Sequence, residues 1–330
     1  MISIRFDIFS IILLEKNEWS RAEWIDVCRG IGICIVVLGH CSPPLYKLIY
    51  SFHMPLFFIL SGYLFKERKL STQMYNMIKR YLAPYFILCF INLMLMTIRG
   101  GGSNFLTYLF GIMYSRGTTQ WMPNCSPLWF LTCIFCSLFI YNLICKIKSG
   151  KVRIILIIFC ALVSYSLYLL DVPKLPWNID TALMSLVFLY CSTMLKKYDS
   201  HFMKISPMVI IVLGVIGAVA AYINPEAVNF DNNYYGNTLL MIVSAITLSL
   251  CLIYFVRRIN PLPKLFSFYG KHTIFIMGFD YLSGSIATQF VHHFMLVFVM
   301  KMIILTIGVL LWTGLIKFIP NEKVRQVLRI

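Results

Sequence analysis

An arginine and a histidine stand at the two ends of one apolar stretch, where both could take part in chemistry. The stretch reads RGIGICIVVLGH and runs from Arg29 to His40. On an α-helix this spacing is about three turns plus about 20°, so both side chains share one face, about 16 Å apart. Histidine can accept a proton near neutral pH, and arginine can bind an anion or a carbonyl oxygen. We expect one polar stripe, with Asp26 paired to Arg29 one turn earlier. The alternative is a snorkelling Arg29 and an interfacial His40 that only solvate themselves.

The next apolar stretch adds a second histidine. It reads SFHMPLFFILSGYLF over residues 51–65 and follows a short turn, so His53 can approach His40. Two histidines at one mouth of a membrane cavity suit an acid–base or substrate-binding pair. Pro55 and the pair Ser61–Gly62 allow helices to approach closely or to open a cavity. Ser61 is a candidate donor to an oxyanion, with helix packing as the alternative.

Five further residues are candidates for substrate binding. Asp280 lies inside an apolar span, where a charge is costly and usually functional. Trp129 suits a sugar-stacking platform or an ordinary interfacial aromatic residue. Asp180 either binds acceptor hydroxyls through its carboxylate or lies at a solvated loop end. Lys79 and Arg80 suit the binding of phosphate groups or the ordinary positive charge of a cytoplasmic loop.

The composition predicts an integral membrane protein of the all-α class. The chain has 330 residues, of which 59% are hydrophobic and 13% charged, whereas soluble chains are nearer one quarter charged. We expect a bundle of about ten transmembrane helices, each near the ~20 residues that a bilayer requires. The expected spans are 24–43, 48–65, 82–99, 127–145, 153–170, 181–196, 207–223, 238–256, 273–290 and 297–318. The CxxC motif of Cys133 and Cys136 falls inside a span and indicates packing, so we expect no metal site.

The basic residues alternate between the two sides of these spans. A net charge of +16 is compatible with a nucleic-acid binder, but most of the 29 Lys and Arg fall at 66–80, 146–153, 196–204, 257–271 and the two termini. This pattern follows the positive-inside rule and places both termini in the cytoplasm. We therefore expect no nucleic-acid partner, a cytoplasmic or interfacial segment 1–21, a transmembrane domain 22–320 and a cytoplasmic tail 321–330. Only a few basic residues fall on the outer side, namely Lys47, Arg99, Arg116, Lys174 and Lys301.

Several of these stretches together resemble the acyltransferase-3 family of integral membrane acyltransferases. The resemblance begins with D-x-x-R-G at 26–30, the Arg29–His40 spacing and FHMPLFFILSGY at 52–63. It continues with RYLAPY at 80–85, PLWFL at 127–131, LPWNIDTAL at 175–183 and FYGKHTIFIMGFDY at 268–281. The fucose 4-O-acetylase-like branch is the most similar one. Two positions depart from the family pattern: Lys79–Arg80, preceded by Met77, stands where an arginine pair is common, and Asp280 stands where many relatives have histidine.

The resemblance implies a ten-helix enzyme that moves an acyl group, usually acetyl, from cytoplasmic acyl-CoA to a hydroxyl of a cell-surface or lipid-linked glycan. It implies that Arg29 and His40 are essential, that acyl-CoA is a substrate and no permanently bound cofactor is needed, and that the protein is a multi-pass protein of a bacterial cytoplasmic membrane. For the chemistry, His40 is the expected general base, and a covalent acetyl-histidine is the variant. The partners expected are acyl-CoA, the glycan or glycolipid acceptor and the lipid bilayer.

Two other classes fit part of the pattern. A transporter or flippase of a polar or glycolipid substrate suits the composition and the buried charges, but the halves of the sequence show no inverted-repeat correspondence. A non-catalytic membrane scaffold has no need for Arg29 and His40 on one helix face. The oligomeric state is left open by the sequence.

Overall fold

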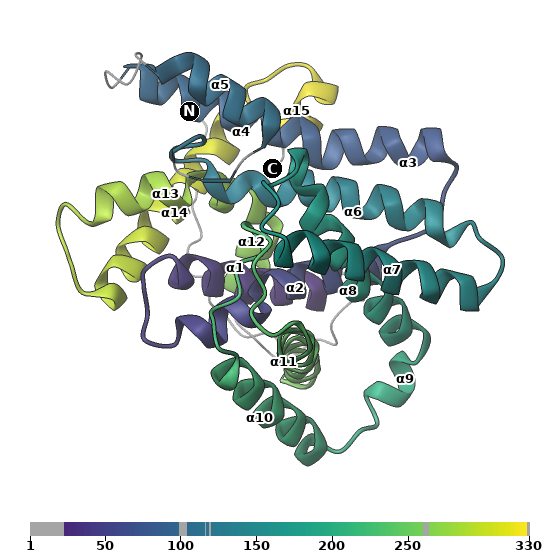
Figure 1. Ribbon diagram of the computed structural model, residues 1–330. Helices are drawn as coiled ribbons and strands as arrows, with labels where there is room; N and C mark the ends of the chain where they lie inside the picture. The colour runs from purple at the N-terminus through teal and green to yellow at the C-terminus, as the bar shows by residue number, and fades with distance from the viewer. Residues whose placement is uncertain (1–22, 99–103, 116, 119, 260–263, 329–330) are drawn as a thin grey trace.

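The chain folds into a bundle of helices (Figure 1). The computed structural model describes residues 23–98, 104–115, 117–118, 120–259 and 264–328, and within these ranges every regular element is a helix. The predicted N-terminal segment 1–21 and the residues Arg99 and Arg116 lie outside the described residues. The all-α class expected from the composition is confirmed for the described part of the chain.

Helices occur in all ten ranges that were expected to span a membrane. They are α1 (Glu23–Gly39), α2 (Tyr46–Leu64), α4 (Ala83–Met96), α6 (Trp129–Cys145), α7 (Gly150–Leu169), α8 (Ile179–Lys197), α10 (Pro207–Ile223), α11 (Thr238–Arg258), α13 (Thr273–Ala287) and α14 (Phe294–Ile316). The remaining α-helices are α3 (Leu70–Met77), α5 (Phe105–Tyr114), α9 (Asp199–Phe202), α12 (Lys264–Lys271) and α15 (Glu322–Leu328).

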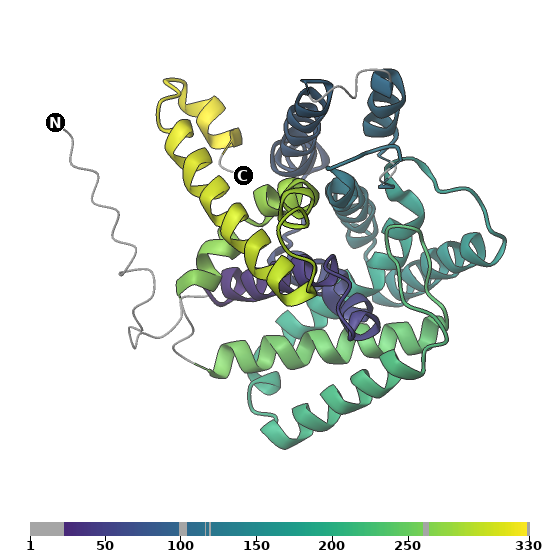
Figure 2. The same cartoon turned by 90° about the vertical axis from the view of Figure 1, so that its left-hand side faces the viewer.

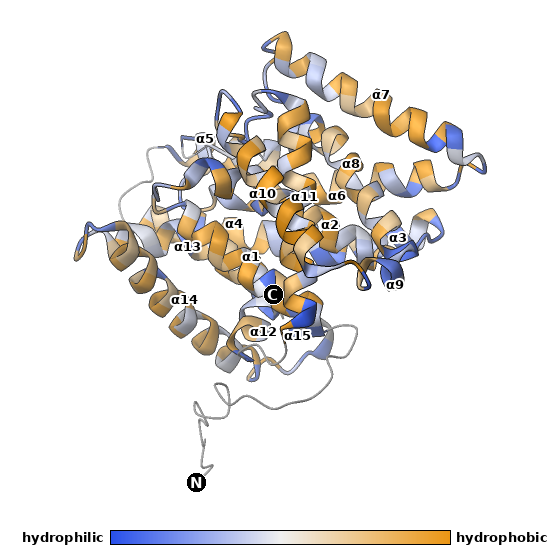
Figure 3. Cartoon of the chain, turned by 90° about the horizontal axis from the view of Figure 1, so that it is seen from below, coloured by the Kyte–Doolittle hydropathy of each residue, from blue (hydrophilic) through white to orange (hydrophobic). Residues whose placement is uncertain are grey.

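Six helical stretches of the described chain are long and apolar enough to cross a membrane. They are Leu70–Met96, Ser126–Cys145, Gly150–Leu169, Pro176–Lys197, Thr238–Arg258 and Phe294–Ile316. Figure 3 shows that apolar residues dominate the long helices, while hydrophilic residues gather at connections and around short helices such as α9 and α15. The chain therefore has the build of a multi-pass membrane protein, and the full count of ten spans stays a prediction.

Helix α1 lies inside the bundle, with other helices around it (Figure 2). It packs against α2, α11, α12, α13 and α14. Its closest neighbour is α12, and two glycines permit this contact. A Cβ atom on Gly30 would lie 1.8 Å from the Phe266 carbonyl oxygen, and one on Gly270 would lie 1.7 Å from the Asp26 carbonyl oxygen. Because protein surrounds α1, the side chains of Arg29 and Asp26 are largely covered by neighbouring helices, with 18% and 22% exposed.

The third span begins earlier than the sequence predicted. Residues 66–80 were expected to form a loop, but the helix already starts at Leu70 and continues through a π-helical turn, Ile78–Leu82, into α4. Pro84 explains the wide turn, because proline lacks an N–H and its ring collides with the carbonyl one turn earlier. The π-helical turn carries Lys79 and Arg80, which therefore occupy fixed positions on a helix.

We predict that Gly30→Ala disrupts the packing of α1 on α12. The added methyl would collide with the backbone of Phe266, which cannot move independently of its helix. The variant should yield much less monodisperse protein in detergent and a lower apparent melting temperature. Gly314→Ala is the matched control, since a Cβ there meets nothing within 4 Å and alanine favours a helix over glycine by about 1 kcal/mol. Equal behaviour of the two variants would contradict this account of the α1–α12 contact.

Candidate active site

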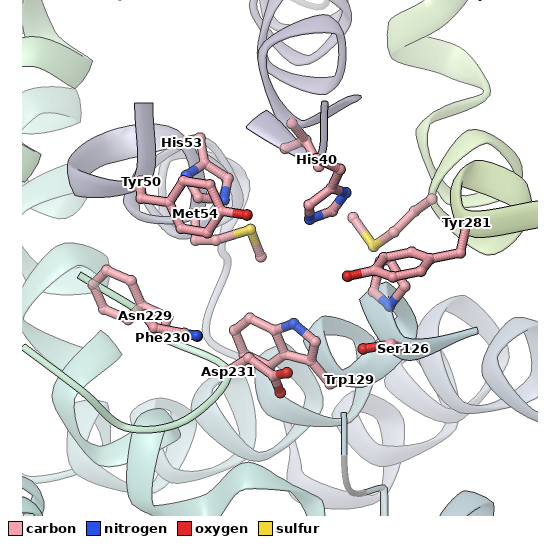
Figure 4. A pocket seen from close by; sticks show the side chains of 13 residues that line it. His40, Tyr50, His53, Met54, Ser126, Trp129, Asn229, Phe230, Asp231 and Tyr281 are labelled. Carbon is pink, nitrogen blue, oxygen red and sulfur yellow. The ribbon is translucent and has the colours of Figure 1, made fainter. Parts of the chain in front are cut away.

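A small pocket surrounds His40 at one end of α1 (Figure 4). Its volume is about 80 Å³, and helices α1, α2 and α13, the start of α6 and the loop 224–237 all contribute to its wall. We call it the outer pocket, after the side of the membrane that the charge pattern predicts. The residues with polar or aromatic side chains that line it are His40, Tyr50, His53, Ser126, Trp129, Asn229, Phe230, Asp231 and Tyr281.

His40 is held by a buried carboxylate. Its Nδ1 atom lies 2.6 Å from Oδ2 of Asp280, which comes from α13 and is fully buried. The other oxygen of Asp280 lies 2.8 Å from Nζ of Lys301 on α14, and the Lys301 side chain is only 3% exposed. A buried charge is tolerated where it is paired. Asp280 therefore joins the end of α1 to the interiors of α13 and α14 in one ionic cluster.

This arrangement sets the tautomer of His40. A carboxylate oxygen only accepts hydrogen bonds, so the Nδ1 atom of His40 must carry the proton that Asp280 receives. The Nε2 atom of a neutral ring is then unprotonated and can accept a proton. Figure 4 shows the imidazole reaching into the outer pocket. His40 therefore has the geometry of a general base that a carboxylate orients.

Two tyrosines and the second histidine complete the wall around His40. Figure 4 shows the hydroxyl groups of Tyr50 and Tyr281 turned into the pocket, and the Tyr281 ring lies 5.3 Å from the His40 ring. His53 is buried and donates from Nδ1 to the Ile49 carbonyl oxygen at 2.8 Å. The Tyr50 ring packs edge-on against the His53 ring at 4.9 Å. The expected approach of His53 to His40 is confirmed, with Tyr50 beside both.

The opposite wall carries a second ion pair. Lys174 places its Nζ atom 2.6 Å from Oδ1 of Asp231 and 5.4 Å from the centre of the Trp129 ring. Asp231 belongs to the loop 224–237, and Figure 4 shows its carboxylate beside Trp129. Burial raises the pKa of the Asp231 carboxyl, while the charge of Lys174 opposes that rise. The pair thus fixes both the loop and the indole that face His40.

The LPWNIDTAL stretch positions Trp129. Asn178 adopts a left-handed backbone conformation with φ of 57°, and its buried side-chain amide donates to the carbonyl oxygens of Ser115 and Trp129 at 3.1 and 3.3 Å. The same amide donates to the Thr132 hydroxyl at 3.2 Å. Asp180 accepts hydrogen bonds from the backbone N–H groups of Thr181 and Leu175. This motif therefore anchors the start of α6.

A basic chamber lies at the other end of α1. Two adjoining pockets of about 300 and 380 Å³ share Arg29, Ser61, Asn76, Arg80 and Tyr81 in their walls. Further cationic residues that line one or the other are Lys66, Arg68, Lys79 and Lys271. Arg29 lies 3.7 Å from Asp26, so the expected pairing of these two residues is confirmed. We call these two pockets together the inner chamber.

The inner chamber and the outer pocket approach each other at Met277. This side chain lines both spaces. Around it, Met54 faces the outer pocket, and Phe57 and Phe130 face the inner chamber with their rings 5.9 Å apart. The separation is therefore a thin apolar layer of flexible and aromatic side chains. Arg29 and His40, which share one face of α1, mark the two ends of this route.

Comparison with known proteins agrees with this geometry. A family model described as an acyltransferase domain, that of the acyltransferase-3 family, matches residues 22–318. This chain belongs to the acyltransferase-3 family. No curated protein and no solved structure matches the chain significantly. The family and the apolar helices together indicate a membrane acyltransferase.

The acyltransferase brings most of the residues predicted from its sequence to these two spaces. His53 and Trp129 line the outer pocket, and Asp280 lies directly behind His40. Ser61, Lys79 and Arg80 line the inner chamber. Their positions are observed, whereas their roles in binding stay predictions.

Two placements differ from expectation. Ser61 lines the inner chamber together with Arg29 and has no place in the wall around His40, so its expected role beside the base lacks geometric support. Asp180 is neither a solvated loop end nor part of the outer pocket wall. It is only 2% exposed and accepts hydrogen bonds from the backbone N–H groups of Leu175 and Thr181 around the start of α8. Backbone N–H groups that need an acceptor at a helix start explain its burial.

The candidate site also contains residues that were not predicted from the sequence. Lys301 was assigned to the outer side of the membrane, but it is buried against Asp280. The signal was present, because FVMKMII places a lysine within an apolar span, where a charge needs a partner. Tyr50, Tyr281 and Asp231 gave no such signal, since their meeting depends on the packing of α2, α13 and the loop 224–237. Among the described residues no group of three or more His, Cys, Asp or Glu could hold a metal ion.

We predict that Lys301→Met destabilises the acyltransferase by leaving the Asp280 carboxylate without its cation. Breaking a buried ion pair typically costs about 3–5 kcal/mol. The apparent melting temperature of the detergent-purified variant should fall clearly, and adding Asp280→Asn should recover part of the loss because the uncompensated charge is gone. Lys317→Met is the matched control, since this lysine is exposed just after the same helix. An unchanged melting temperature in Lys301→Met would show that the pair contributes nothing.

Proposed function

We propose that this protein is an O-acyltransferase, with acetyl as the group it moves, that carries the acyl group from cytoplasmic acyl-CoA to a hydroxyl of a cell-surface or lipid-linked glycan. The observation that carries the proposal is the pairing of two spaces along α1: a basic chamber at Arg29 and a pocket around a carboxylate-oriented histidine, separated by the layer at Met277. We place the protein in a bacterial cytoplasmic membrane and, by its motifs, in the fucose 4-O-acetylase-like branch.

The inner chamber suits the acyl-CoA donor. CoA carries several phosphate negative charges at one end and a slender thioester arm at the other. Arginine and lysine bind phosphate oxygens through charge-assisted hydrogen bonds, and the chamber offers Arg29, Lys79, Arg80 and Lys271. The basic connections predicted to lie in the cytoplasm adjoin it. The arm would extend past Phe57 and Phe130 toward Met277, so the thioester would approach His40.

The outer pocket suits the transfer step. The acceptor hydroxyl gives its proton to Nε2 of His40 while its oxygen attacks the thioester carbonyl carbon. A tetrahedral intermediate forms, and its collapse breaks the carbon–sulfur bond. The proton on His40 then passes to the departing CoA thiolate, so the ring is restored and the ester is complete. The ring carries a positive charge between these steps, and the neighbouring Asp280 carboxylate stabilises that charge.

Groups in the same wall suit the charge that develops on the carbonyl oxygen. The hydroxyl groups of Tyr50 and Tyr281 are turned into the pocket near His40 (Figure 4). Donors fixed in place before the reaction stabilise an oxyanion without reorganisation. Each tyrosine is held by packing, Tyr50 against His53 and Tyr281 against His40. We assign these two hydroxyls as the oxyanion donors, in place of Ser61.

We predict that His40→Ala abolishes acyl transfer while donor binding persists. Loss of a placed general base lowers the rate by about 10²–10⁴-fold, and the inner chamber does not include His40. The assay is transfer of radiolabelled acetyl from acetyl-CoA to the glycans of membranes at matched expression. His292→Ala is the matched control, because His292 is exposed and lines neither space. Undiminished transfer by His40→Ala would refute the assignment of His40 as the general base. If the protein were instead a transporter of the glycan, its activity would not depend on acetyl-CoA.

We predict that the double variant Lys79→Gln, Arg80→Gln binds CoA at least about tenfold more weakly. Hydrogen bonds to charged groups contribute about 1.5–3 kcal/mol, and each 1.4 kcal/mol is about tenfold in affinity. Calorimetric titration of purified protein with CoA measures the change. Lys148→Gln, Lys151→Gln is the matched control, since Lys148 lies just before α7, Lys151 lies in its first turn, and both are exposed and line neither pocket. Equal CoA affinity in both double variants would show that the π-helical turn does not contribute to CoA binding.

A further inference from the structure

A groove outside the outer pocket remains without an assigned role. Its volume is about 300 Å³, nearly four times that of the pocket around His40. The start of α2 and the loop 224–237 form its walls, and Tyr50 and Asn229 line both spaces. The groove therefore adjoins the pocket, with Tyr50 and Asn229 at the boundary between the two spaces. Since the pocket itself holds only a few water-sized groups, most of an acceptor must lie outside it.

The wall of the groove consists of aromatic and amide side chains. Tyr46 and Tyr50 stand four residues apart and so share one face of α2, and Tyr234 lies on the loop opposite. The amides belong to Asn229 and Asn232, and the rest of the wall is Ala227 and Val228. Tyr46 is 46% exposed, so its ring is open to a ligand.

The loop that forms one wall is fixed before any ligand arrives. Lys47 donates to the carbonyl oxygens of Asn224 and Pro225 at 3.2 and 3.4 Å. Asn229 and Tyr234 exchange two backbone hydrogen bonds of 2.8 and 2.9 Å. Behind them, the Thr181 hydroxyl donates to the Phe230 carbonyl oxygen at 2.7 Å. A site on a rigid support loses little entropy when it binds its ligand.

From these observations we infer that the groove is a subsite for a neutral sugar unit adjacent to the one that is acylated. Aromatic faces pack against the C–H face of a sugar ring, and amides exchange hydrogen bonds with its hydroxyls. None of the residues that line the groove carries a charge, and the nearby Asp231 is paired with Lys174. The inference rests on the proposed function and narrows its acceptor to a neutral chain of two or more sugars.

The path from groove to pocket agrees with such a chain. Along α2, Tyr46 lies at the groove, Tyr50 lines both spaces, and His53 lies in the wall of the outer pocket. These residues follow one face of the helix at spacings of four and three. One sugar would lie against Tyr46 and Tyr234, and the next would extend past Tyr50 so that its hydroxyl reaches His40.

The test is binding of the purified protein, in lipid nanodiscs, to an array of neutral and anionic oligosaccharides of one to six units. We expect retention of neutral chains of at least two sugars, and Tyr46→Ala or Asn232→Ala should weaken that retention about tenfold, as loss of one stacking or hydrogen-bonding group does. Tyr222→Ala is the matched control, because Tyr222 is 81% exposed near the same loop but lines neither space. Retention of anionic chains alone, retention of no neutral chain, or equal binding by Tyr46→Ala would overturn the inference.

Acyl transfer to the retained glycans separates this inference from the proposed function. If the protein binds neutral chains through Tyr46 but does not acylate them in the presence of acetyl-CoA, the sugar subsite is supported and the proposed acyl transfer is refuted. If wild type and Tyr46→Ala acylate a glycan with the same KM for that glycan, the proposed acyl transfer is supported and the sugar subsite is refuted.

Discussion

The carboxylate of Asp280 is the group on which the site depends. An ionised carboxyl away from water is tolerated only with partners, and Asp280 has two, His40 at 2.6 Å and Lys301 at 2.8 Å. Each partner comes from a different part of the chain, so the two ionic contacts of Asp280 hold α1, α13 and α14 together at this end of the bundle. The same contact leaves Nε2 of His40 facing the pocket. One interaction thus provides both the local packing and the tautomer that leaves Nε2 available to accept a proton.

The rest of the fold supports a route along α1. The contact of Gly30 and Gly270 lets α12 lie directly against α1 and places Lys271 beside the chamber that Arg29 lines. At the other end, Asn178 fixes the start of α6 and with it Trp129. The family's motifs therefore fall into two groups. Some line the spaces where substrates would meet, and others, such as LPWNIDTAL, hold the helices that carry those residues.

Much of this arrangement could be read from residue types and spacing. Apolar runs located the helices, and the helical period placed Arg29 and His40 on one face. The cost of a charge in an apolar span singled out Asp280. The same argument applied to Lys301, but this lysine was assigned to the outer side by the charge rule, which ignores buried partners. The π-helical turn, Tyr50, Tyr281 and Asp231 could not be predicted, because their placement follows from Pro84 in its helical context and from contacts between segments far apart in sequence.

The most direct test of the account is a structure of the protein with a thioether analogue of acetyl-CoA, which cannot transfer its acyl group. The account predicts the phosphates in the chamber lined by Arg29 and Arg80, with the arm past Met277. The carbonyl carbon should lie in the outer pocket, where an acceptor oxygen bound to His40 could reach it at about 3–3.5 Å. An analogue whose phosphates bind elsewhere, or whose carbonyl stays in the inner chamber away from His40, would contradict the claim that the two spaces meet at this histidine.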